Sequence, residues 1–363
     1  MNKLTKITLA VLTSFAMLSS VLTAGEFSVT GGVKGTYSIR SSDSPSGGND
    51  LGKGLGITNE FTLGASGELD NGMTWNYAQD IDNATVQDDA KLTMTTDFGT
   101  IGMFISEGSL SQKYKFDNSA YGIGSDNGYG GGATSSGASA NTMQYGTNLS
   151  SYNNLQYHLP NGILPLGGTF KAGYSPSANT GANNSGNSGG QASAEAKVAE
   201  YALTLAPTDA LYIGASYFDK SGETAVQQGY EAGSLVGKYT YGPVGIGYGL
   251  TRVALALDAV AGTAYTQGYL NRAVSIGYAV NDDLSVSFAR EESEKAIKTY
   301  TAAGSGGNVA LTRTDVEMEI QTIQAAYTMG GMTIAVAMND HTSARYTDGM
   351  DVKDTVIQVS MAF

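Results

Sequence analysis

The chain has 363 residues, with 20 Lys and Arg against 33 Asp and Glu, no cysteine, two histidines and a formal net charge of −13. The lack of cysteine excludes disulfide scaffolds and Cys-ligated metal sites, and two histidines leave little for imidazole-based acid–base chemistry. The negative charge predicts a surface that repels nucleic acid and anionic headgroups, and it predicts that any water path through the molecule favours cations.

The first 24 residues have the pattern of a secretion signal. Lys3 and Lys6 precede a mostly apolar stretch at 9–22, and small residues follow at 23–25. This stretch is too short and too interrupted to span a bilayer as a helix. We predict a signal peptide at 1–24 and a mature chain at 25–363. Removing 1–24 takes away two lysines and no acid, so the charge changes from −13 to −15.

The segment 26–40 is the clearest predicted strand. Phe27, Val29, Val33, Tyr37 and Ile39 fall on one face, and mostly polar residues fall between them. Ten steps from Phe27 to Tyr37 span about 33 Å along a strand. With a tilt of about 45°, this is about 23 Å of height, close to the apolar band of a membrane barrel.

Period-two segments continue to the end of the chain. The predicted strands cover 26–40, 56–69, 73–82, 90–95, 101–105, 155–159, 170–174, 196–206, 210–218, 232–241, 244–252, 269–280, 284–290, 314–329, 332–339 and 351–363. Long and short connections alternate between these sixteen segments, as in an up-and-down barrel with an even number of strands. Near 322–323 the apolar phase slips, which predicts a β-bulge.

The last strand ends on an aromatic residue. Ile357, Val359 and Met361 are apolar, and the residues between them are small or polar. A free amphipathic edge strand at a terminus needs cover from another strand. The first strand of the same chain is the simplest cover, and this pairing would close a barrel.

Residues 107–150 interrupt the alternation. They contain many Gly and Ser and four tyrosines, Tyr114, Tyr121, Tyr129 and Tyr145. An irregular loop of this length is normally functional or disordered. The tyrosines could form a stacking path for aromatic or sugar solutes, or they could anchor the loop to a wall.

Alternation alone does not separate a membrane barrel from a soluble sandwich, because both have one apolar face per strand. Four features favour the barrel: the predicted signal, the Gly-, Ser-, Thr-, Asn- and Lys-rich wet faces, strands that often reach nine residues or more, and the two edges that sixteen sequential strands would leave in an open sheet. We therefore predict an all-β, antiparallel up-and-down transmembrane β-barrel of about 16 strands.

The chain resembles the general porins of the Gram-negative outer membrane, which are trimeric and have sixteen strands. The matching residues are the opening strand 26–40, the hairpin 68–75, the segment 90–102 and the strand ending at Phe363. The resemblance implies a third loop folded into the pore at about 107–150 and passive diffusion of small hydrophilic solutes. It also implies export through the periplasm, a homotrimer among outer-membrane lipid and lipopolysaccharide, and recognition of Phe363 by the barrel-assembly machinery.

The resemblance also implies which residues form the pore constriction. Acids of the third loop would be Glu107, Asp117 and Asp126, and the basic wall would be Lys34, Lys91 and Lys171. The alternative is that these are solvated loop charges and lumen lining away from the narrowest point. The wall is sparsely basic compared with the family, because Glu60, Asp80 and His158 share the inward parity.

Other chemistry finds little support in the sequence. His158 lies on a predicted strand and His341 begins a loop, so no Ser/His/Asp set is evident and we predict no enzyme. Acidic clusters at 82–89 and 348–354 lack the fixed spacing of a cation loop, so we predict no metal site and no cofactor. A structural or adhesive barrel with an occluded lumen, working through loops 175–191 and 291–313, is the alternative function. The mostly small inward side chains favour a channel.

Overall fold

The structure is a computed structural model that describes residues 25–42, 52–82, 85–120, 122–127, 143–176, 197–221, 227–257, 264–301 and 310–363. The predicted signal peptide at 1–24, Tyr121, Tyr129 and most of the loop 175–191 lie outside the described residues.

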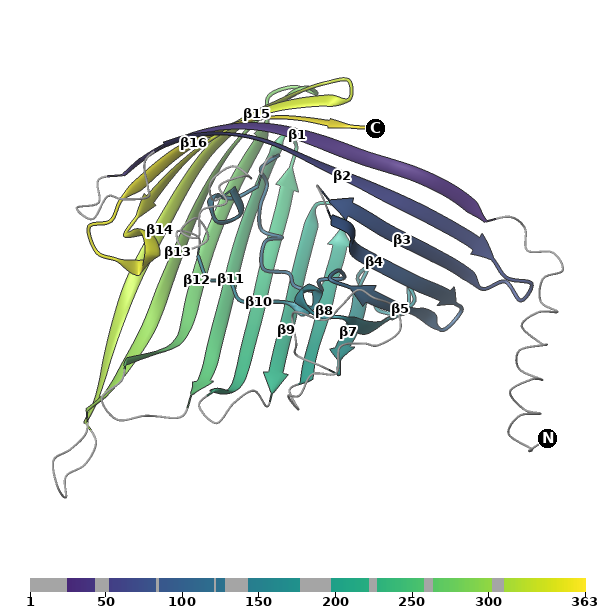
Figure 1. Cartoon of the computed structure of the whole chain (residues 1–363), viewed down its shortest axis with the longest axis horizontal. Coiled ribbons are helices and arrows are strands. Elements are labelled where there is room, and N and C mark those ends of the chain that lie inside the picture. Colours follow the sequence, from purple (N-terminus) through teal and green to yellow (C-terminus); the bar gives the residue numbers. More distant parts are fainter. Residues whose placement is uncertain are drawn as a thin grey trace.

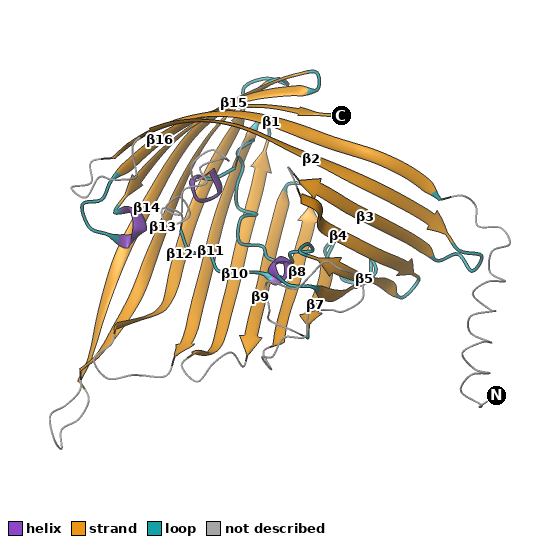
Figure 2. Cartoon of the chain, viewed as in Figure 1, coloured by secondary structure: helices purple, strands orange, loops and turns teal. Residues whose placement is uncertain are grey.

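Sixteen strands form nearly all of the described chain (Figure 2). They are β1 (Glu26–Ser42), β2 (Gly52–Glu68), β3 (Thr74–Asp82), β4 (Thr85–Thr96), β5 (Gly99–Ile105), β6 (Asn154–His158), β7 (Thr169–Ser175), β8 (Lys197–Thr208), β9 (Leu211–Ser221), β10 (Gln227–Tyr241), β11 (Val244–Leu257), β12 (Ala264–Ala279), β13 (Leu284–Thr301), β14 (Ala310–Met329), β15 (Met332–Thr342) and β16 (Val352–Ala362). Three short helical turns, α2 (Gly124–Asn127), η2 (Leu149–Ser151) and η3 (Ala344–Tyr346), lie between strands. The predicted number and order of strands are confirmed.

Each strand pairs antiparallel with its neighbours in the chain, and β1 pairs with β16, so the sheet is a closed barrel (Figure 1). The last residue completes the closure, because Gly31 and Phe363 exchange backbone N–H···O hydrogen bonds of 2.9 Å in both directions. The Phe363 ring also lies 5.5 Å from the ring of Phe61 on β2. The predicted closure by the first and last strands is confirmed.

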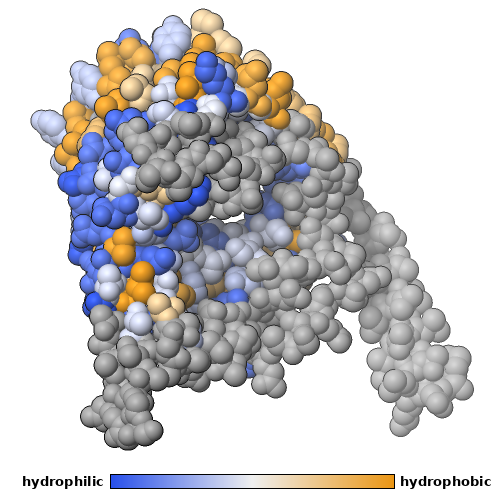
Figure 3. All heavy atoms as spheres, turned by 60° about the vertical axis from the view of Figure 1, so that its left-hand side comes forward, coloured by the Kyte–Doolittle hydropathy of each residue, from blue (hydrophilic) through white to orange (hydrophobic). Residues whose placement is uncertain are grey.

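Each strand has an apolar face and a polar face, as the alternation predicts. Large hydrophobic side chains such as Ile57 (78% exposed), Ile101, Tyr217 and Ile276 are exposed on the apolar face. The positions between them carry Gly, small polar residues and charges. In Figure 3 hydrophobic residues gather at the top of the view, and hydrophilic residues cover its left flank.

Several strands extend further than the sequence predicts. The expected loop 291–313 is largely strand, because β13 continues to Thr301 and β14 begins at Ala310. Similarly, only residues 83–84 separate β3 from β4, where we expected a loop at 83–89. The physical reason is visible on β13: Arg290, Glu292 and Glu294 continue the face that carries Phe288, so both faces are polar there and the alternation disappears.

The predicted bulge at 322–323 is wrong. Thr322 pairs with Ala289 and Asn339, and Ile323 pairs with Phe288, without a register shift. The phase slips because Ile320 is fully buried on the polar face, whereas Ile323 is 58% exposed on the apolar face. Register shifts occur elsewhere, between Gln79 and Ile81, Leu205 and Thr208, Gln227 and Gly229, and Thr266 and Gly268.

Candidate pore constriction

The described part of the long connection between β5 and β6 lies against the polar face of β8–β14. Its described residues, 106–120, 122–127 and 143–153, are called the crossing segment below. Backbone N–H groups of this segment donate to side chains of successive strands: Leu110 to Glu200 of β8 (3.2 Å), Gln112 to Ser216 of β9 (3.0 Å), Asn118 to Ser275 of β12 (2.9 Å) and Ser125 to Glu291 of β13 (3.0 Å). The segment is therefore tied across about half of the wall.

Two buried carboxylates carry most of this attachment. Glu200, 1% exposed, also accepts from the N–H of Leu149 at 2.8 Å, so both ends of the crossing segment meet at one side chain. Glu291, 1% exposed, accepts from the hydroxyl of Ser125 and from the phenol of Tyr145, each at 2.7 Å. A buried charge is tolerated only when hydrogen bonds replace its water. Both glutamates are thus specific anchors.

Apolar contacts supplement these anchors. Leu110, Leu149 and Tyr152 pack with Val198, Phe218 and Val253, which lie on the polar face of β8, β9 and β11. On β14, Met318 and Ile320 pack with Met143 and Tyr145. Tyr114 and Tyr145 meet edge to face at 5.0 Å. Tyr114 and Tyr145, the two of the four candidate tyrosines that the structure describes, therefore pack where the segment contacts the wall, which agrees with a role in anchoring the loop.

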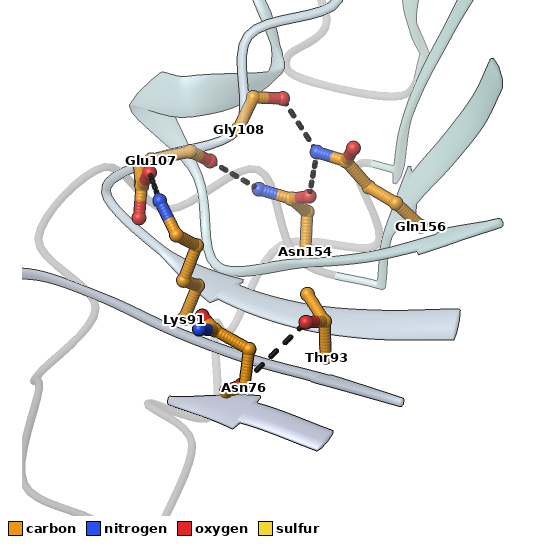
Figure 4. A network of polar contacts seen from close by, with 7 residues as sticks. All are labelled: Asn76, Lys91, Thr93, Glu107, Gly108, Asn154 and Gln156. Carbon is orange, nitrogen blue, oxygen red and sulfur yellow. Dashed lines mark hydrogen bonds and ion pairs between the residues drawn. The ribbon is translucent and has the colours of Figure 1, made fainter. Parts of the chain in front are cut away.

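Lys91 and Glu107 meet at the start of the crossing segment (Figure 4). The Lys91 ammonium lies 2.5 Å from Glu107 Oε1, and the two side chains are 34% and 25% exposed. The adjoining backbone is held by β6: Asn154 Nδ2 donates to the Glu107 carbonyl at 3.1 Å, and Gln156 Nε2 donates to the Gly108 carbonyl at 2.5 Å. A predicted wall base and a predicted loop acid are therefore brought together.

Asp117 lies further along the crossing segment and faces different groups. Its carboxylate accepts from the backbone N–H (2.9 Å) and the hydroxyl (2.7 Å) of Ser119, and its carbonyl accepts from the ammonium of Lys238 on β10 at 2.6 Å. Burial raises the pKa of Asp117 above its usual value of 3.8, although the hydrogen bonds from Ser119 act in the opposite direction.

The other predicted site residues lie apart from this pair. Asp126 lies in α2, and its side chain is outside the description. Following the strand register from Lys171 on β7 through β6 and β5 leads to a position on β4 four residues from Lys91, which is about 13 Å along the strand. Lys34 is exposed on β1. By the strand register it is offset from Lys91 by six residues, which is about 20 Å along the strands. The structure does not gather the three lysines into one wall.

The sequence reasoning missed the most buried charges of the site. In the sequence Glu200 and Glu291 look like ordinary acids on the polar face of a strand, but in the structure they are buried wall residues. Lys113, 9% exposed, belongs to the crossing segment, where its ammonium donates to the Gly146 carbonyl at 2.6 Å. Among these most buried charges, the acids lie on the wall and the base lies on the segment, which is the reverse of the arrangement that the Lys91–Glu107 pair keeps.

An open cavity of about 390 Å³ lies against the polar face of β1–β3. Its lining includes Lys34 and the acids Glu60 and Asp82, with several threonines and glycines. Among the residues that the structure describes, no group of three His, Asp or Glu could hold a metal ion. Likewise, no helix in the described part is long and apolar enough to cross a membrane.

Comparisons with solved structures place the barrel in a known fold. The anion-selective porin of Comamonas acidovorans aligns with a TM-score of 0.64 over 93% of this chain and 100% of its own, at 12% identity. The trimer form of OmpT, an outer membrane protein of Vibrio cholerae, aligns with 0.61 over 94% and 100%, at 12% identity. The chain has the porin fold. OmpF of Salmonella typhi, solved with daunomycin, aligns with 0.55 over 94% and 98%, at 15% identity. No protein-family model and no curated protein sequence matches. At these identities the likeness shows the fold alone.

Proposed function

We propose that the polar face encloses a water-filled pore through a bacterial outer membrane, for passive diffusion of ions and small hydrophilic solutes. The observation that carries this proposal is the asymmetric filling of the barrel. The crossing segment packs against β8–β14, while a cavity of about 390 Å³ with polar lining remains against β1–β3. On this proposal, the described part of the third loop narrows the pore without closing it.

The apolar face supports the membrane location. Large side chains such as Phe27 (67% exposed), Leu55 (85%) and Ile57 (78%) would leave an extended apolar surface in water, which soluble monomers avoid. The predicted signal peptide supports export through the periplasm. Three copies would assemble as in the trimer form of OmpT, and Phe363 would be recognised during assembly. We assign no catalytic reaction to the barrel.

Cation preference follows from the charges along the open part of the pore. Glu60, Asp80 and Asp82 share the polar face of β1–β3 with the bases Lys34 and Arg40 of β1, so among these residues acids outnumber bases by three to two. A low-dielectric wall lined by one sign of charge concentrates ions of the other sign. The charge of the predicted mature chain, −15, acts in the same direction. In contrast, the Lys91–Glu107 pair is neutral as a unit.

Planar-bilayer recording of the purified mature chain tests the proposal. We expect stepwise, ohmic current and, under a KCl gradient, a reversal potential of the sign for cation selectivity. Glu60→Gln with Asp82→Asn should shift that potential towards zero, and Asp315→Asn on the apolar face should leave it unchanged. A protein that inserts but stays silent would support an occluded structural or adhesive barrel instead. An anion-selective potential would refute the cation preference alone.

A further inference from the structure

The apolar face changes character along β11–β14. Val274 and Ile276 of β12, Phe288 of β13 and Ile323 of β14 are exposed hydrophobic residues. Two positions beyond Val274 stands Arg272, and two beyond Phe288 stands Arg290, about 7 Å further along each strand. From there on, Arg290 pairs with Glu292 and Glu319 at 2.7 Å each. An apolar band therefore ends at a band of charged residues.

A hollow of about 490 Å³ opens within the charged band. It arises because the pairing of β11 with β12 ends at Ala254 and Gly268, next to the register shift between Thr266 and Gly268. Beyond this point β11 continues with β10 and β12 continues with β13, so the two strands separate. The hollow is thus built by the backbone of two regular strands.

The charged residues that line the hollow are mostly positive. Arg252, Lys298 and Arg313 line it, and Glu294 is its one acid among the described residues, so the formal charge is +2. Glu294 is already engaged by Arg313 at 3.2 Å. The side chains of Arg252 and Lys298 form no hydrogen bond or ion pair with any described residue.

A fourth donor belongs to the same hollow. The Nε2 atom of Gln267, at the register shift, is buried without a partner among the described residues. A buried amide N–H without an acceptor is costly, by about 1–3 kcal/mol. Arg252 and Lys298, which have no partner among the described residues, and the shared guanidinium of Arg313 are a donor set for an oxyanion, and the buried amide of Gln267 lies beside them.

We propose that this hollow binds the phosphate of an anionic lipid headgroup. This rests on the proposed membrane location. Arg252, Glu294 and Lys298 of the hollow lie on the same face of the sheet as the apolar band. The acyl chains of the same molecule can therefore lie against Val274, Ile276 and Phe288. The net charge of −13 repels free anions from the bulk, whereas a lipid is held at the surface by its chains and its phosphate meets only the local charge.

Native mass spectrometry of the full mature protein in detergent tests the proposal, with phosphatidic acid as the probe and diacylglycerol of the same chains as its neutral counterpart. The variant Arg252→Gln with Lys298→Gln removes these two cations. Lys53→Gln is the matched control, because Lys53 is an exposed lysine on the apolar-face side of β2, away from the hollow. Inorganic phosphate alone is the competitor.

We expect the double variant to bind phosphatidic acid about tenfold more weakly, from the loss of charge-assisted hydrogen bonds. Diacylglycerol binding and the Lys53→Gln variant should be unaffected. Equal weakening in Lys53→Gln, or unchanged binding in the double variant, overturns the proposal. If millimolar inorganic phosphate displaces phosphatidic acid, the hollow binds free phosphate and the assignment to a lipid headgroup is wrong. Channel current separates this test from the pore, because the double variant should conduct as the unmodified protein does.

Discussion

The attachment of the crossing segment to Glu291 gives a prediction that the structure quantifies. Glu291→Ala removes the acceptor of three hydrogen bonds, from the Ser125 N–H (3.0 Å), the Ser125 hydroxyl (2.7 Å) and the Tyr145 phenol (2.7 Å). Each hydrogen bond to a charged acceptor contributes about 1.5–3 kcal/mol. Because water can enter the space and satisfy part of the donors, we take the lower limit, about 4 kcal/mol in total.

A loss of about 4 kcal/mol raises the population of the detached segment about a thousandfold, since each 1.4 kcal/mol is a factor of ten. The barrel itself should persist, because β13 keeps its pairing with β12 and β14 through the backbone. We therefore expect channels of larger and noisier conductance from a protein that still resists heat and detergent like the unmodified barrel.

Glu292→Ala is the matched control. Glu292 is the next residue on the same strand, but it points to the apolar face, is 44% exposed and pairs with Arg290 at 2.7 Å. Tyr145→Phe, which removes one of the three hydrogen bonds, should give an intermediate effect. Single-channel records of Glu291→Ala that match those of Glu292→Ala in size and noise would refute the assignment of Glu291 as an anchor.

Three further predictions follow from other contacts. Gly247→Ala should disturb the crossing segment by about 1–3 kcal/mol and increase channel noise, because its added Cβ would overlap the Phe116 carbonyl, whereas Gly35→Ala has open space and should behave as the unmodified protein in the same bilayer records. Burial raises the pKa of Asp117, so protonation of Asp117 stabilises the packed crossing segment, and the packing of the segment should weaken as the pH rises through that pKa. Protonation also removes a negative charge, so the cation preference should fall as the pH drops. Reversal potentials of Asp117→Asn should lack this part of the pH dependence. Phe363→Ala removes the ring contact with Phe61, about 0.5–1.5 kcal/mol, and should lower the temperature at which the barrel unfolds on a heated detergent gel, while Phe98→Ala at an exposed turn should not; equal melting of the two would contradict a role for the seam.

The strands were predictable because their apolar faces keep a period of two along the apolar band, as in Phe27–Ile39 of β1. Prediction failed where the strands extend beyond the apolar band. The ends of β13 and β14 carry Arg290, Glu292 and Arg313 on the face that was apolar before, so a regular strand has the composition of a loop.

The candidate site was predictable only in part, for a related reason. Lys91 and Glu107 have the right parity and position, but Glu200 and Glu291 become anchors only through a segment about 50 to 170 positions away in the chain, which no local pattern contains. One signal was present. Phe218, Val253, Met318 and Ile320 are large apolar residues on the polar face, and such residues indicate that something packs there.

The seam between Gly31 and Phe363 has a consequence for biogenesis. These two partners are separated by more than 300 positions, so their contact has one of the largest loop-closure entropies that the chain can incur. Until the final strand docks, the sheet keeps two unsatisfied edges that are open to other chains. An exported chain therefore remains prone to aggregation until β16 pairs with β1, and a chaperone that shields the edge of β1 would protect it longest.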